Sequence, residues 1–305
     1  MRGAPAAAVP AAYLAVVLLW STTPLAINWS LPVGGFAFSL FARMGVGLLC
    51  ALALLQLTGA GFPLRRGVWP AYLVGGGSLF GTLSCVYWGA QFIPSGLISV
   101  VFGLSPLVTS IIAAIWLGER ALTPVKTLGM ALALGGLFVV FGRGEELGGD
   151  QAVTGLAVML LAVLINAMGL VGMKRVGGTT PPLAITAGIM LVSWPLFGLA
   201  WWLGDGSLPQ QWPSRGVLSI LYLGVFGSVL GFGLYYYLMK HLATTTLAMI
   251  TVLTPLLALL LGHLFNDEVL PPQVWLGAVV ICIGLYLNLR GGRADARVLV
   301  AEKVG

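Results

Sequence analysis

The sequence predicts an all-α membrane protein, in which ten transmembrane helices form two inverted repeats of five and both termini lie in the cytoplasm. Three observations support this fold class: the composition, the lengths of the apolar segments and a repeat at a constant offset. The 305 residues are 59% hydrophobic and 8% charged, with a mean hydropathy of +1.01. Because a soluble domain carries about 25% charged residues, this chain cannot keep its whole surface in water.

Long apolar segments fill the chain between Pro10 and Leu289. A helix needs about 20 apolar residues to cross a bilayer. The ten expected helices cover residues 10–29, 34–58, 68–93, 95–118, 123–142, 151–173, 177–204, 216–239, 242–266 and 269–289. The connections between them are too short to form a soluble domain with a core of its own. The first segment lacks a separate cleavage site, so we expect it to be retained.

The first five segments contain two charged residues, and the last five contain none. Arg43 lies well inside the second segment, whereas Lys126 lies in the first turn of the fifth and can reach the interface. A polar link containing Glu145, Glu146 and Asp150 separates the two halves. We therefore expect a first repeat over residues 10–142, a second over residues 151–290 and a cytoplasmic tail over residues 291–305.

The two halves share residues at one offset. Pro106 and Pro255 lie 149 positions apart, and so do Glu119 and Glu268. The same offset pairs Leu104 with Leu253, Val125 with Val274, Gly135 with Gly284 and Gly142 with Gly291. A constant offset indicates internal duplication. Because each copy has an odd number of helices, the copies insert upside down relative to each other, as in transporters that alternate access to a site near the midplane.

The basic residues predict the orientation. With the N-terminus inside, twelve of the fifteen Lys and Arg residues lie on the cytoplasmic side, Arg143 and Arg215 lie outside, and Arg43 lies in the membrane. Cytoplasmic loops carry this excess of positive charge, so both termini are expected inside. The rule also explains the net charge of +6 without a nucleic-acid partner.

The apolar segments lack the buried acidic residues that catalysis, metal binding or proton coupling would use. Cys50, Cys85 and Cys282 lie in apolar surroundings, where cysteine acts as a small hydrophobe. None of the nine acidic residues falls at mid-span, and there is no P-loop. We therefore expect no cofactor and no metal, and an intramembrane enzyme is only a remote alternative because it needs a buried acid.

Pro106 and Pro255 lie near the centres of the fourth and ninth expected helices. Proline removes a backbone donor and clashes with the preceding turn, so each helix is expected to be kinked there. The freed carbonyls then need protein groups or water in a cavity. The alternative is a kink that serves packing alone.

A polar and aromatic face follows the third expected helix. Ser84, Tyr87, Trp88 and Gln91 share it at helical spacing. The repeat offset maps these positions onto Gly233, Tyr236, Tyr237 and Lys240. The face is expected to line a cavity or the bundle interior, and the alternative is an aromatic belt at the membrane interface.

Two polar residues stand inside spans. Arg43 can attract a substrate carboxylate, or it can bond to carbonyls of a broken helix and hold the fold together. Asn166 lies at mid-span in the sixth expected helix. It is expected to face the interior and to form a hydrogen bond with another helix or with a substrate.

Three blocks resemble the drug/metabolite transporter superfamily and, within it, the EamA-type exporters. They are Leu19-Trp20-Ser21-Thr22-Thr23-Pro24, Arg43, and the stretch from Ser105-Pro106 through Leu117-Gly118-Glu119-Arg120 to Gly135-Gly136. In the second repeat, Asn266-Asp267-Glu268 replaces the Leu-Gly-Glu-Arg block. Within the EamA type, the chain is most similar to the YddG-type aromatic amino-acid exporters.

The resemblance implies a bacterial inner-membrane exporter of neutral, chiefly aromatic or hydrophobic amino acids and related metabolites. It also implies a central cavity and substrate contacts at Trp20, Tyr87, Trp88, Phe102, Ser105, Asn166, Tyr236, Tyr237 and Thr251, to which its charge adds Arg43. We expect facilitated diffusion by alternating access, within the lipid bilayer and without an obligatory protein partner. Efflux of amphipathic cationic drugs or other small metabolites is the alternative.

Overall fold

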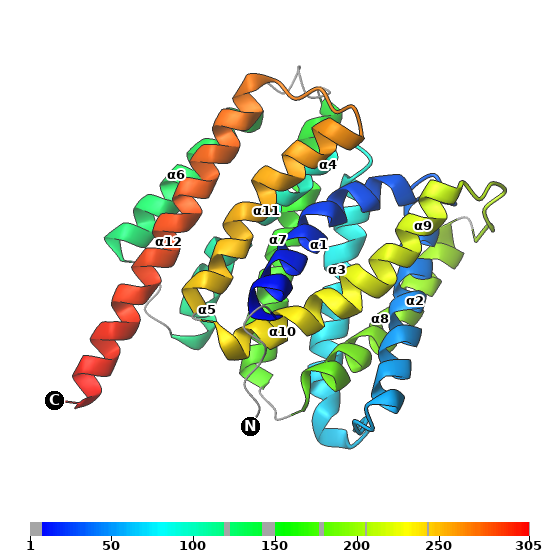
Figure 1. Cartoon of the computed structure of the whole chain (residues 1–305), viewed down its shortest axis with the longest axis horizontal. Helices are drawn as coiled ribbons and strands as arrows, with labels where there is room; N and C mark the ends of the chain where they lie inside the picture. Colours follow the sequence, from blue (N-terminus) through cyan, green and yellow to red (C-terminus); the bar gives the residue numbers. More distant parts are fainter. Residues whose placement is uncertain are drawn as a thin grey trace.

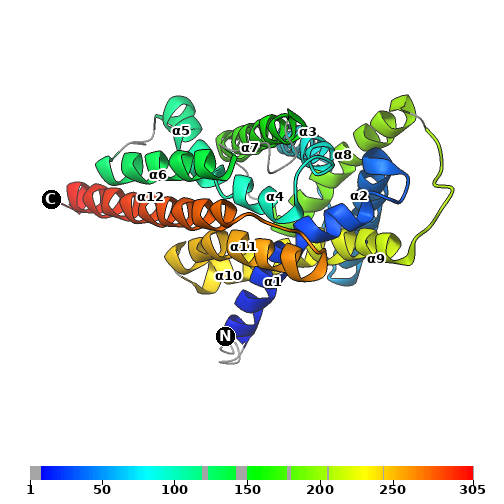
Figure 2. The ribbon, with the colours of Figure 1, turned by 90° about the horizontal axis from the view of Figure 1, so that it is seen from above.

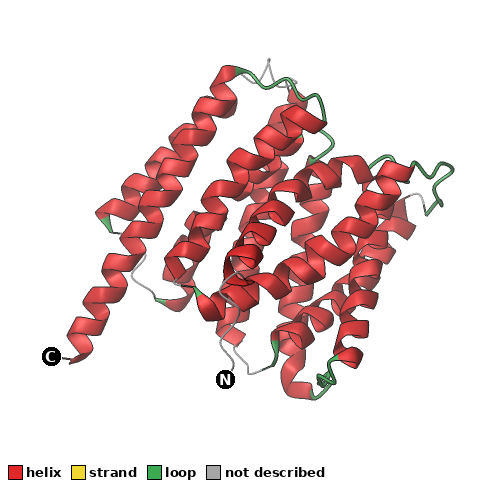
Figure 3. Cartoon of the chain, in the orientation of Figure 1, coloured by secondary structure: helices red, strands yellow, loops and turns green. Residues whose placement is uncertain are grey.

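A computed structural model describes residues 8–118, 123–141, 150–176, 180–204, 206–242 and 244–304, and this part contains helices and no strand (Figure 3). The elements are α1 (Ala8–Ser30), α2 (Gly35–Leu57), the short 3₁₀ helix η1 (Arg66–Val68), α3 (Trp69–Gly89), α4 (Ser95–Phe102), α5 (Ser105–Leu117), α6 (Pro124–Phe141), α7 (Asp150–Val176), α8 (Pro182–Gly204), α9 (Ser214–Tyr222), the π-helical segment η3 (Leu223–Leu230), α10 (Gly231–His241), α11 (Thr244–Phe265) and α12 (Pro272–Val304). The all-α prediction is confirmed for these residues.

Six helical segments of the described chain are long and apolar enough to cross a membrane. They are Ala8–Ser30, Gly35–Leu57, Ser95–Leu117, Asp150–Val176, Pro182–Gly204 and Ser214–Tyr235. Shorter apolar helical stretches follow at Pro124–Val140, Met249–Phe265 and Pro272–Asn288. The structure thus agrees with a helical membrane protein, while ten spans in inverted repeats stay a prediction.

The fourth expected helix is interrupted by a turn just before its proline, although the backbone of this turn stays in the right-handed helical region. α4 ends at Phe102, Gly103 and Leu104 form a turn, and α5 begins at Ser105. Pro106 therefore lies in the first turn of a new helix, where its missing N–H has no helical partner to lose. By contrast, α11 runs without interruption through Pro255. The kinks expected at Pro106 and Pro255 stay predictions.

The eighth expected helix also differs from a regular α-helix. It consists of α9, η3 and α10 in direct succession, and the middle segment has π-helical hydrogen bonding. The Ser228 hydroxyl donates to the carbonyl of Leu223, five residues earlier, at 2.9 Å. Such wider turns are rare and frequently occur at functional sites.

The last helix is longer than expected. α12 continues to Val304 and so includes nearly all of the tail predicted over residues 291–305. Arg, Ala, Leu, Glu and Lys dominate this stretch and favour helix formation, which explains why it extends the last apolar helix.

The helices are arranged with α6 and α12 side by side at one edge, and with α2 and α8 at the other (Figures 1 and 2). Between these edges, α3 packs on both α7 and α8, α4 packs on α11, and α1 packs on α9, α10 and α11. Helices from the two halves of the sequence therefore alternate through the molecule. A Cβ added to Gly136 would lie 2.7 Å from the carbonyl oxygen of Gly277, so the α6–α12 contact requires glycine.

Candidate functional site

Arg43, on α2, is buried against α3. The residue is 5% exposed, and its Nη1 donates a hydrogen bond to the hydroxyl of Tyr87 at 3.2 Å. Tyr87 is fully buried, and the Arg43 guanidinium carbon lies 5.8 Å from the centre of its ring. The buried Nε of Arg43 has no hydrogen-bond partner. A buried charge is costly unless it is paired, so this guanidinium retains the capacity to bind an anion.

The π-helical segment leaves a small space beside this guanidinium. A Cβ added to Gly227 would lie 3.8 Å from Arg43 Nη2, 3.7 Å from Thr23 Oγ1 and 3.6 Å from a methyl group of Leu223. These are ordinary van der Waals distances, so a methyl-sized group fits there. We call Thr23, Arg43, Tyr87 and Gly227 the Arg43 site.

The polar groups of the Arg43 site suit a zwitterion. The guanidinium is a planar fork of donors that matches a carboxylate. The hydroxyl of Thr23 donates to the carbonyl of Leu19 at 2.7 Å, and its oxygen can therefore accept a hydrogen bond from an ammonium group.

An aromatic cluster lies about one helical turn from the Arg43 site, between α1 and α10. Trp20 precedes Thr23 by three residues on α1, and its ring contacts Tyr235 at 5.0 Å and Phe232 at 6.3 Å between centroids. A Cβ on Gly231, four residues after Gly227, would lie 3.2 Å from the Trp20 indole nitrogen. Polar and aromatic groups thus follow each other along the α1–η3–α10 contact.

Asn166 and Ser105 form a second pair of predicted residues. The Asn166 Nδ2 donates to the Ser105 hydroxyl at 2.9 Å, which joins α7 to the first residue of α5. Asn166 therefore bonds to another helix, one of the two alternatives that the sequence left open.

The other predicted contacts are not gathered around Arg43. Trp88 packs on its neighbour Phe92 at 4.6 Å, and Tyr237 packs on His241 of its own helix at 4.3 Å. Phe102 is half-buried against the main core, and Thr251 is half-buried on α11. The side chain of Tyr236 lies outside the described residues.

Sequence reasoning missed Gly227 and the role of Thr23. The glycines at 224, 227, 231 and 233 are the signal that marks an irregular helix with close neighbours. Thr22, beside Thr23, shares a 2.6 Å hydrogen bond with the Tyr222 hydroxyl, and this contact fixes α1 against α9.

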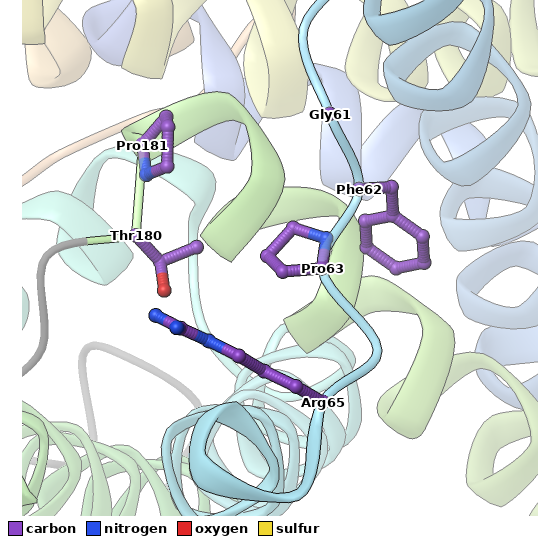
Figure 4. Close-up of a pocket in the computed structure, with 6 residues that line it drawn as sticks. All are labelled: Gly61, Phe62, Pro63, Arg65, Thr180 and Pro181. Carbon is purple, nitrogen blue, oxygen red and sulfur yellow. The ribbon is translucent and has the colours of Figure 1, made fainter.

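A surface pocket of about 360 Å³ lies apart from these residues, between the α2–α3 connection and the start of α8. The side chain of Arg65 extends across it toward Thr180 (Figure 4). None of the predicted contacts lines this pocket.

Comparison with known proteins then decides the family. The profile of the EamA-like transporter family matches residues 9–142 and residues 153–290. The chain belongs to the EamA-like transporter family. The predicted resemblance is confirmed at this level, and it makes the chain a multi-pass membrane transporter of the drug/metabolite superfamily rather than a member of an enzyme family.

Relatives from bacteria show how far the similarity extends. The uncharacterized transporter YvbV of Bacillus subtilis is 26% identical over 282 residues, which cover 89% of this chain and 88% of the relative. The uncharacterized inner membrane transporter YedA of Escherichia coli K12 is 27% identical over 92% and 90%. A protein described as a probable amino-acid metabolite efflux pump of the same strain is 30% identical over 66% and 69%.

A solved structure shares the fold. It is titled "Crystal structure of protein" and matches with a TM-score of 0.67 at 21% identity, over 96% of this chain and 99% of that one. The YddG-type specificity within the family stays a prediction.

Proposed function

We propose that this EamA transporter exports neutral, chiefly aromatic and hydrophobic amino acids and related metabolites across the bacterial inner membrane. The observation that carries the proposal is the buried Arg43 guanidinium, whose Nε has no hydrogen-bond partner and whose Nη2 borders a methyl-sized space. The amino-acid efflux description of the Escherichia coli relative supports the same substrate class.

The substrate would bind with its carboxylate on Arg43 and its ammonium group on Thr23. Its side chain would extend toward Trp20, Phe232 and Tyr235, one turn along α1. Aromatic neighbours favour an aromatic or large apolar side chain. Tyr87 would hold the guanidinium in place through its hydroxyl.

Transport would proceed by alternating access between two inverted halves, residues 10–142 and 151–290, with both termini and the tail over residues 291–305 in the cytoplasm. The break before Pro106 and the proline in α11 are the positions at which the helices would bend during the cycle. No coupling ion is required by this arrangement, so we propose a facilitator.

The aromatic cluster also suits an amphipathic cation, because a cation binds over the face of Trp or Tyr. Arg43 opposes this alternative, since a second positive charge would repel the guanidinium. The two substrate classes can therefore be separated by competition.

Counterflow in proteoliposomes tests the proposal. Wild-type protein is expected to exchange labelled Phe, and R43Q is expected to lose at least about tenfold in rate, the effect of removing a hydrogen bond to a charged group. R43K keeps the charge but not the fork and should recover part of the rate. Folded protein that exchanges none of Phe, Met or Thr, or that exchanges a quaternary cation instead, contradicts the proposal.

A further inference from the structure

A second group of polar contacts lies at the end of the molecule opposite the start of α1 and the end of α12, where the α11–α12 connection meets α4 (Figure 1). Glu268, in this connection, places its carboxylate at the N-terminus of α4. Its Oε1 accepts a hydrogen bond from the Ser95 N–H at 3.0 Å, and its Oε2 lies 3.5 Å from the Gly96 nitrogen. The first N–H groups of a helix have no helical partners, so this carboxylate acts as their cap.

The cap comes from the other half of the sequence because α4 does not supply its own. The residue before α4 is Pro94, which has no side-chain acceptor. A negative charge at a helix N-terminus also interacts favourably with the helix dipole. Glu268 therefore joins two helices, α4 and α11, that belong to different repeats.

Two glycines make the contact close. A Cβ on Gly262, in the last turns of α11, would clash with the Glu268 Oε2. A Cβ on Gly96 would lie 2.6 Å from the Cα of Leu259. The carboxylate and the first turn of α4 thus occupy space that larger residues would fill.

Neighbouring groups hold the α11–α12 connection in place. Asn266 Nδ2 donates to Glu268 Oε1 at 2.9 Å, and the Trp29 indole donates to Asn266 Oδ1 at 2.8 Å. Arg215, at the start of α9, stacks on the Trp29 ring at 3.7 Å and donates to the carbonyl of Phe265 at 2.8 Å. Elements α1, α4, α9 and α11 are therefore linked at this end.

We propose that Glu268 is a latch that keeps this end of the transporter closed, and that its carboxylate must leave the N-terminus of α4 when the path opens there. In the predicted orientation this end faces outward, so the latched state opens toward the cytoplasm and accepts substrate for export. This consequence rests on the proposed transport function, whereas the contact itself does not.

The repeat makes the latch one-sided. The offset of 149 pairs Gly96 with Thr245 and Gly262 with Ala113. The corresponding contact at the other end would have to accommodate two larger residues. The close approach that two glycines permit at Glu268 is therefore not available to the matching positions of the other repeat.

Spin-label distances test the latch without any transport. A label at Q91C marks the chain just before α4, and a label at V269C marks the α11–α12 connection just after Glu268. Both side chains are exposed. The native cysteines are replaced by alanine in this background. In the parent we expect mainly one short distance between the two labels. In E268Q and in G262A the fraction of molecules with a longer distance is expected to be at least about tenfold larger than in the parent, because a hydrogen bond to a charged group is lost.

The matched control is D267N, which removes the same charge from the exposed neighbouring residue. It is expected to leave the distances unchanged. Unchanged distances in both E268Q and G262A overturn the latch, and equal changes in D267N do so as well.

Hydrogen exchange and counterflow complete the test. The amides of Ser95 and Gly96 are expected to exchange about tenfold faster in E268Q than in D267N. If wild-type protein shows no amino-acid counterflow while the label distances and amide exchange rates differ as expected, the transport proposal fails and the latch stands. If counterflow is intact and the differences are absent, the latch fails and the transport proposal stands.

Discussion

The segments Ser95–Leu117 and Thr244–Phe265 carry the same motif but have different backbones. The first is divided into α4 and α5 by a turn at Gly103 and Leu104, three and two residues before its proline. The second is one helix, and its residue three positions before the proline is Val252, which is buried. Gly103 keeps right-handed helical backbone angles (φ −54°, ψ −24°), so the turn does not need the conformational freedom of glycine. Gly103 instead allows Leu285 and the ring of Pro255 to approach closely. The proline alone therefore does not decide the conformation.

The break also contacts the other segment. A Cβ on Gly103 would lie 3.6 Å from the ring of Pro255 and 3.3 Å from a methyl group of Leu285. The two prolines are thus parts of one packed region in which one segment is broken and the other is not. This is the asymmetry expected if two related segments occupy different states of an alternating-access cycle.

The largest expected effect comes from giving the first segment the residue of the second. G103V places a side chain 3.0 Å from the carbonyl of Val100 and against Leu285. Overpacking of this kind costs about 1–3 kcal/mol, so the melting temperature in detergent should fall and counterflow should slow. G135V is the matched control, because an added Cβ on Gly135 meets nothing within 4 Å. Equal stability of the two variants would contradict the role assigned to Gly103.

A smaller effect is expected from P255A, which makes α11 a regular helix. The restored donor should stabilise α11 by roughly 1 kcal/mol, which corresponds to about a fivefold change in equilibrium. We expect a higher melting temperature and slower counterflow, because the helix gains the backbone hydrogen bond that Pro255 cannot make and bends less easily there. P195A, in the interior of α8, is the control that should leave counterflow unchanged. Faster transport by P255A would contradict the role assigned to Pro255 as a position at which α11 bends.

The smallest effect is expected from N166A, which removes the bond to the first residue of α5. Hydrogen bonds between membrane helices contribute about 0.6 kcal/mol on average. Counterflow and melting temperature should change slightly, and more than in S110A, whose hydroxyl donates to the carbonyl of Pro106 on the same helix at 2.8 Å. A loss of transport beyond about tenfold would instead indicate that Asn166 contacts the substrate.

The sequence predicted several features that depend on local pattern. Long uncharged segments require helices in a membrane, because no water is present there to satisfy the backbone. The resemblance to the EamA type rested on residues 19–24, on Arg43 and on the stretch that contains the Leu-Gly-Glu-Arg block, and the match over both halves confirmed the family. Arg43 could be selected from the sequence because a charge inside an apolar segment is rare.

Other features depend on residues far apart in the chain. The pairing of Arg43 with Tyr87, the space at Gly227 and the cap that Glu268 forms on α4 follow from how helices of the two halves pack. The fourth expected helix is interrupted just before its proline, whereas the same proline motif in α11 gives no interruption. Composition and segment length thus determined that the chain lies in a membrane as helices, because these properties depend on each segment by itself, and the motifs pointed to the family. Only the tertiary structure brought Arg43 to Tyr87 and Glu268 to the N-terminus of α4, because each contact requires groups from different helices to meet at hydrogen-bond distance.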